Sequence, residues 1–312
     1  MVGADVAIVI NVSDPLSVAI GKYYAAKRHI PQHNIARVRF AHNRSDLTPA
    51  EFAVLQASVL RQLNAHIQAY VLTWARPYRV GCTSITWAFA FGRVSEDCGG
   101  TCHETPRSPY YNSDVSRPYD ELRIRPAMSL AAVDFAHARQ LIDRGVRADR
   151  LLPNGAAYLL SSSDVQRNVR ATEYPLAGTV AGSQISVRLV RQEQFKDRQD
   201  VLFAFVGALT VDGLETNRFL PGAMADHLTS FGGMLTDSPQ MSSLRWLEAG
   251  ATGSFGTVVE PCNYPGKFPN VAVAMRHYLA GETLLEAYWK SVAMPVQGIF
   301  IGEPLAAPFA AR

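Results

Sequence analysis

Apolar runs alternate with amphipathic segments along the first part of the chain. Runs at residues 6–12, 35–40 and 70–74 predict three strands, and residues 15–28 predict a helix between the first two. A second helix is predicted from Thr48, as its N-cap, through Pro49 to about residue 67. Strand and helix repeated in this order favour right-handed crossovers and a mainly parallel sheet.

The same alternation resumes beyond residue 130 and continues to the end of the chain. Helices are predicted at 130–144, from Asp164, and at 242–249, 270–279 and 283–291. Strands are predicted at 156–161, 185–190, 201–206, 254–259 and 298–301. We therefore expect a single α/β domain over residues 1–312, with helices on both faces of a mainly parallel sheet.

Residues 80–125 interrupt this pattern. They are rich in Gly, Pro, Ser and Tyr, which predicts a loop-rich insertion or lid after the third strand. Three of its tyrosines, Tyr110, Tyr111 and Tyr119, are expected to form a contact surface for a protein partner. The segment also contains Cys98 and Cys102, which we expect to form a short disulfide or no bond.

Composition narrows the functional classes. Of 312 residues, 48% are hydrophobic and 18% charged, which is typical of a folded soluble protein. The net charge of +3 comes without any long basic run, so we expect no nucleic-acid partner. No apolar stretch is long enough to span a bilayer. We expect a cytoplasmic protein as the sequence stands, or a periplasmic or secreted one if a leader has been removed.

One candidate site lies in residues 221–233, after the strand predicted at 201–206. It gathers Asp226, His227, Thr229 and Ser230 before Gly232 and Gly233. Ligands of doubly wound sheets sit beyond the carboxyl ends of strands, which favours a functional role here. The alternative is structural: Asp226 caps a helix that begins at His227, and the glycines end it.

A second candidate site follows the strand predicted at 254–259. Glu260, Cys262, Asn263 and Lys267 lie there on a loop punctuated by prolines. A thiolate of Cys262 would act as nucleophile if His227 served as base and Asp226 or Glu260 oriented the imidazole. The alternative is that Cys262 is a small, half-buried residue and that Glu260 pairs with Lys267 structurally.

The remaining groups at the two candidate sites complete this hypothesis. Backbone amides near Gly232 and Gly233 would stabilise an oxyanion. A peptide or small-molecule substrate would contact the polar side chains and glycines around the reacting groups, namely Thr229, Ser230, Gly232, Gly233, Asn263 and Lys267.

Metal and cofactor sites are less well supported. Cys98, Cys102, His103 and Glu104 lie close together but lack the second pair that zinc sites require. An oxygen-ligand site of Asp226, His227 and Glu260 is a third hypothesis. Nucleotide-binding glycine motifs are absent from the sequence, and we expect no cofactor. A serine nucleophile elbow is absent as well, so the sequence does not favour a serine hydrolase.

Three segments follow one another in the last third of the chain: WLEAGATGSFGT at 246–257, the helix GETLLEAY at 281–288 and the closing IGEPL at 301–305. In this order they resemble the C-terminal part of gingipain-like cysteine peptidases. The resemblance implies a caspase-like fold and a cysteine-dependent hydrolase. The chain also resembles an uncharacterised bacterial family that shares DHLTSFGG, GTVVEPCNYP and GEPLAAPF, found here at 226–233, 256–265 and 302–309.

The chain departs from the peptidases at both catalytic positions. Gly207-Ala208-Leu209 stands where the peptidases have Gly-His-Gly, and no cysteine lies between Cys102 and Cys262. Any Cys262–His227 site is therefore a rearranged one. Three functions follow: a hydrolase with this rearranged site, a non-catalytic binding or surface protein that retains a peptidase-like fold, and a metal-binding protein.

Overall fold

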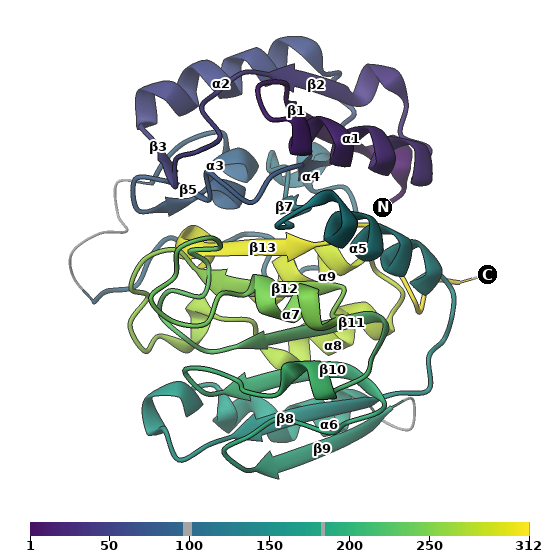
Figure 1. The fold of residues 1–312 in the computed structure, drawn as a ribbon, viewed down its shortest axis with the longest axis vertical. Helices are drawn as coiled ribbons and strands as arrows, with labels where there is room; N and C mark the ends of the chain where they lie inside the picture. Colours follow the sequence, from purple (N-terminus) through teal and green to yellow (C-terminus); the bar gives the residue numbers. More distant parts are fainter. Residues whose placement is uncertain (96–101, 182–184, 312) are drawn as a thin grey trace.

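Ten strands form one central sheet in the computed structural model, which describes residues 1–95, 102–181 and 185–311 (Figure 1). The strand order across the sheet is β2-β1-β4-β7-β13-β12-β11-β10-β8-β9. In chain order these strands are β1 Val6–Asn11, β2 Ile35–Val38, β4 Ala69–Leu72, β7 Ala127–Ser129, β8 Ala156–Ser161, β9 Ser186–Arg191, β10 Val201–Gly207, β11 Phe219–His227, β12 Gly253–Thr257 and β13 Gly298–Gly302.

The sheet consists of two parallel halves that run in opposite directions. Neighbouring strands are parallel throughout this sheet except at the β12–β13 pair, which is antiparallel. The expected α/β class with a mainly parallel sheet is therefore confirmed. The carboxyl ends of β8 to β12 meet at one edge of the sheet, and those of β1, β2, β4, β7 and β13 meet at the opposite edge.

Helices cover both faces of the sheet (Figure 1). On one face lie α1 Pro15–Lys27, α5 Phe135–Ala148 and α7 Leu244–Ala249, with α1 packed against α5. The other face carries α6 Tyr174–Ala181, α8 Val271–Leu279 and α9 Leu284–Ser291, which pack in that order. In the first half, α2 Pro49–Gln62 contacts α3 Ile85–Phe91 through the rings of Phe52 and Phe89. Because both faces are covered, β1 and β10 are buried along their whole length and consist almost entirely of apolar residues and glycine.

Most predicted elements lie within a few residues of the observed ones, but the prediction lacks two strands of the central sheet. These are β7, and β11, which occupies the segment expected to be a loop or the start of a helix. The helix expected from Asp164 is instead the 3-10 turn η3, Val165–Asn168, followed later by α6. Among the described residues no helix has the length and apolar character required to cross a membrane.

The segment expected as a lid is only partly irregular. Its first residues belong to a small three-stranded sheet, in which β5 Arg79–Val80 lies between β6 Thr83–Ser84 and the earlier strand β3 Asp46–Leu47. The segment also contains α3 and α4 Pro118–Leu122. Helix α3 belongs to the core, because it packs on β7 and β13 and Thr86 Oγ1 donates to Gly298 O at 3.3 Å. The expectation of a lid is therefore wrong for residues 85–91. Residues 96–101, including Cys98, lie outside the described part.

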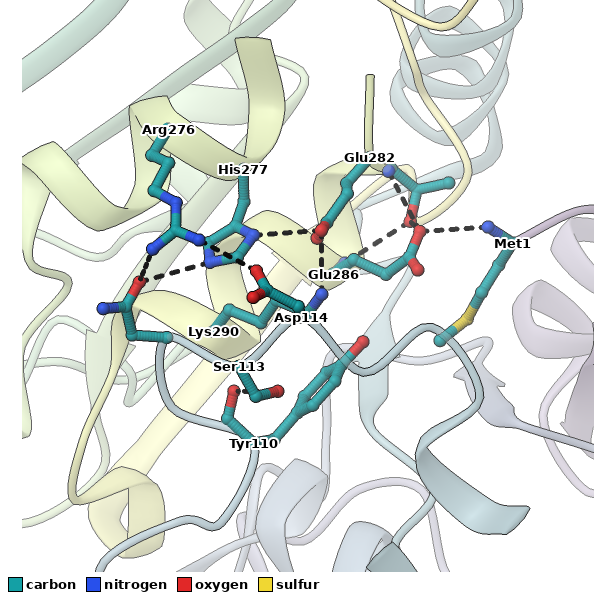
Figure 2. Close-up of polar contacts among 11 residues, drawn as sticks. Met1, Tyr110, Ser113, Asp114, Arg276, His277, Glu282, Glu286 and Lys290 are labelled. Carbon is teal, nitrogen blue, oxygen red and sulfur yellow. Dashed lines mark hydrogen bonds and ion pairs between the residues drawn. The ribbon is translucent and has the colours of Figure 1, made fainter. Parts of the chain in front are cut away.

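The rest of that segment is attached to α8 and α9 by the polar network in Figure 2. Asn112 N donates to Lys290 O at 2.9 Å, and Arg276 Nη1 donates to Asn112 Oδ1 at 3.0 Å. Lys290 Nζ lies 2.8 Å from Glu282 Oε1 and 5.0 Å from the centre of the Tyr110 ring. Tyr110 is fully buried, so the expectation that its ring forms a contact surface is wrong.

Candidate functional site

A crevice opens at the edge of the sheet where the strands of the second half end. It measures 500 Å³ and is lined by residues that follow three strands, and by Cys102. Gln166 and Arg167 follow β8, Ser230 follows β11, and the loop that follows β12 supplies Glu260, Cys262, Asn263 and Tyr264. Because these strands are parallel, segments far apart in the sequence converge here. The structure thus brings Ser230, Glu260, Cys262 and Asn263 together, as expected.

Hydrogen bonds to Asp164 fix the position of the turn η3, which forms one side of the crevice. Asp164 Oδ1 accepts from the backbone N–H groups of Gln166 at 3.1 Å and Arg167 at 3.3 Å, which caps the turn. Arg167 Nε is buried without a hydrogen-bond partner among the described residues and lies 3.9 Å from Asp164 Oδ2. Gln166 Oε1 accepts from Asn263 Nδ2, which joins η3 to the loop after β12.

The loop after β12 carries Glu260, whose charge is opposite to that of Arg167. Glu260 Oε1 accepts from Cys262 N at 2.7 Å, and Glu260 O accepts from Gln297 Nε2 at 2.9 Å. These bonds stabilise a turn in which Cys262 has a φ of 57°, a conformation that most side chains avoid. Glu260 is exposed and Arg167 is partly exposed, so the crevice presents one acidic and one basic side chain to solvent.

Cys262 is bonded to Cys102 in a disulfide with a Cα–Cα distance of 5.6 Å, across 160 residues of sequence. Its sulfur therefore has no ionisable thiol, and the hypothesis of a Cys262 nucleophile is wrong for this structure. The short Cys98–Cys102 disulfide is wrong as well, because Cys102 has a different partner. Among the described residues there is no free cysteine.

His227 is a structural histidine rather than a base. Its Nδ1 accepts from Trp246 Nε1 at 3.0 Å, so its Nε2 carries the proton and donates to Met241 O at 3.1 Å. Burial and, next, the positive charge of Arg170 together lower the pKa of His227 to about 3. With both ring nitrogens occupied and the side chain buried, the expected role of His227 as a catalytic base is wrong.

Asp226 does not orient His227 because neighbouring residues of a strand point to opposite faces of the sheet. Its carboxylate instead pairs with Arg170, and both side chains are 1% exposed. Burial raises the pKa of Asp226, and the Arg170 guanidinium opposes that rise. Because Asp226 and His227 point to opposite faces of the sheet, they cannot bind one metal ion together with Glu260, and the expected metal site is wrong. Among the residues that the structure describes, no group of three or more His, Cys, Asp or Glu side chains is placed to hold a metal ion.

The remaining predicted contact residues are buried beside the crevice and do not line it. Thr229 Oγ1 hydrogen bonds to Gln240, and Gly233 N donates to Thr257 O at 2.9 Å. A Cβ on Gly233 would lie 2.7 Å from Gly256 O, so this glycine permits close packing against β12. The amide of Gly233 is therefore unavailable to an oxyanion, and that expectation is wrong.

Gly232 and Lys267 complete this group. Gly232 O accepts from Ser243 N at 2.8 Å, which ties the loop to the start of α7. Lys267 is 2% exposed, with Nζ 5.1 Å from the centre of the Tyr264 ring. Neither residue reaches the crevice.

Sequence reasoning missed Gln166, Arg167, Tyr264 and Cys102 as lining residues. The signal for the first two was the capping Asp164 directly after the strand 156–161, which we read only as a helix start. Tyr264 joins the site because its hydroxyl donates to Cys102 O at 3.3 Å.

Comparisons with protein-family models, curated proteins and solved structures found no match to this chain.

Proposed function

We propose that the chain is a non-catalytic binding protein whose crevice holds a zwitterionic ligand the size of an amino acid or dipeptide. One observation carries the proposal: the crevice presents Arg167 and Glu260 from different strand ends, while its sulfur atoms are joined in a disulfide. A guanidinium recognises a carboxylate, and a carboxylate recognises an ammonium group. The carboxamides of Gln166 and Asn263 add donors and acceptors that match a peptide bond.

The resemblance to gingipain-like peptidases supports the proposal that this chain keeps a peptidase-like fold without the catalytic histidine and cysteine. The strand-end positions where we expect the peptidase residues are filled by structural groups here. A Cβ on Gly207 would lie 2.1 Å from Asn168 Oδ1, Ala208 is buried, and His227 is occupied as described above. A caspase-like ancestry of the second half of the sheet is part of this proposal.

The disulfide supports an oxidising compartment, such as the periplasm or the cell exterior. Disulfides persist there and are rare in the reducing cytosol. The bond joins Cys262, in the loop after β12, to Cys102 and so stabilises the wall of the crevice, which both residues line.

The test compares alanylalanine with N-acetyl-alanyl-alanine amide by isothermal titration calorimetry on the oxidised protein. We expect only the free dipeptide to bind, and Arg167→Gln or Glu260→Gln to weaken it about tenfold or more, the effect of losing a charged hydrogen bond. Arg139→Gln, on the exposed side of α5, is the matched control and leaves binding unchanged.

Two results would contradict the proposal. Equal binding of the free and blocked dipeptides would remove the role assigned to the two charges. Hydrolysis of a peptide or ester substrate that Cys262→Ala abolishes would instead restore the cysteine-hydrolase hypothesis.

A further inference from the structure

A groove in the first half of the sheet lies far from the crevice in the strand order. It runs between the outermost strand, β2, and helix α2, at the upper end of Figure 1, and measures 790 Å³. A second hollow that shares Arg39 and Phe40 extends it past the end of β2. The volume falls within the range of known ligand sites.

The groove is basic. Arg37, Arg39 and Arg61 line it and are exposed. Among the described residues none of these three side chains has a hydrogen bond or an ion pair. The one acidic lining residue, Glu51, is engaged by Arg44 at 2.7 Å and by Thr48 N at 2.7 Å. Three unneutralised guanidinium groups on one surface favour an anionic ligand.

The groove also exposes the edge of the sheet. Strand β2 pairs with β1 on one side only. On its free side, Arg37 N donates to Gln62 Oε1 at 2.9 Å and Gln62 Nε2 donates to Arg37 O at 3.0 Å. The carboxamide of Gln62 therefore makes the two bonds that the main chain of an added strand would make. Because Gln62 is an exposed side chain at the end of α2, a peptide can displace it at the cost of two exchanged hydrogen bonds.

Apolar side chains form the floor of the groove. Val38 and Leu55 are buried there, and Val54 on α2 is 72% exposed. An exposed valine beside a hollow gives an apolar side chain of a ligand a place to pack. Free nucleotides or polyphosphates would leave that surface unused.

We infer that this groove binds an extended acidic peptide, which adds to the edge of β2 in place of Gln62. Acidic residues alternate with apolar ones, because side chains of a strand two residues apart share a face. The acidic side chains pair with Arg37, Arg39 and Arg61, and the apolar ones pack toward Val54 and Leu55. This site does not depend on the function proposed for the crevice.

The experiment measures fluorescence anisotropy of the labelled peptide Glu-Val-Glu-Val-Glu-Val on the full chain. Peptides with Gln or Lys in place of Glu, and one with a central Pro that lacks the pairing N–H, carry the same label. We expect the acidic peptide to bind more tightly than the other three, with affinity that falls as salt rises.

Variants separate charge from edge pairing. We expect Arg37→Gln/Arg39→Gln to weaken binding about five- to tenfold, because each exposed ion pair contributes modestly. Arg139→Gln/Arg147→Gln on α5 is the matched control and leaves binding unchanged. Gln62→Ala frees the edge groups of Arg37 and strengthens binding. Unchanged melting temperatures confirm that these exposed substitutions leave the fold intact.

Three outcomes would overturn the inference. One is equal binding of the Glu and Gln peptides. Another is weaker binding by Gln62→Ala or no effect of the proline. The third is displacement of the peptide by inorganic polyphosphate at equal charge concentration with the same strength as by unlabelled peptide, which would show a general anion site.

Discussion

The buried imidazole of His227 makes stability depend on pH in a way that can be isolated. Its pKa is lowered to about 3 from the usual 6.5. Between these values the unfolded chain binds a proton on this histidine and the folded chain does not. Stability is therefore fully retained above about pH 6.5 and falls as the pH decreases toward 3. The slope approaches about 1.4 kcal/mol per pH unit below pH 6, so roughly 2 kcal/mol of stability is lost between pH 6.5 and 4.5.

The variant His227→Leu removes that slope. At pH 7 it also destabilises the fold by about 2–4 kcal/mol, because Trp246 Nε1–H and Met241 O lose their partner in the interior. Urea unfolding at half-unit steps from pH 7.5 to 4.5 gives both quantities, with the exposed His42→Gln as control. NMR adds a direct observation, since the ring protons of His227 should not titrate above pH 5. Parallel wild-type and His227→Leu curves, or a titration of His227 near 6.5, would refute the reasoning.

Three further substitutions test the structure through urea unfolding. The double variant Cys102→Ser/Cys262→Ser should lower the free energy of unfolding by up to about 5 kcal/mol, because the disulfide closes a loop of 160 residues in the unfolded chain. A decrease of less than about 1 kcal/mol would contradict the bond. Asp226→Leu should cost about 3–5 kcal/mol, because it leaves Arg170 buried and unpaired, and adding Arg170→Met should recover most of it; no recovery would contradict the pairing. Gly233→Ala should cost about 1–3 kcal/mol through its contact with Gly256 O, and a neutral effect would show that the backbone yields there.

Local patterns were sufficient to predict most of the fold. Strand β8 was predicted with its observed bounds, Thr48 caps its helix as expected, and the helix expected at 270–279 is α8. Strand β11 was missed because its turn-type residues near the start, including Gly222 with a φ of 89°, and its polar Asp226 and His227 look like a loop. Tertiary partners decide that segment: Arg170 and Trp246 provide the buried contacts that make two polar side chains acceptable in a central strand.

Several candidate residues lie together as predicted, but the chemistry expected of Cys262 and His227 is wrong. Strand ends indicated where Ser230, Glu260 and Asn263 would lie, because parallel strands bring their carboxyl ends together. Spacing along the chain carries no information on a bond that joins Cys102 to Cys262 across 160 residues. Likewise, the environment of His227 depends on its hydrogen bonds with Trp246 and Met241, which no sequence pattern predicts.

The most direct test of the account is peptide mapping of the native protein by mass spectrometry after alkylation without reductant. The central claim is a crevice that binds its ligand without a reactive thiolate. The account predicts a linked pair of peptides containing Cys102 and Cys262, and no alkylation of Cys262. Rapid alkylation of Cys262 in the native protein would contradict it.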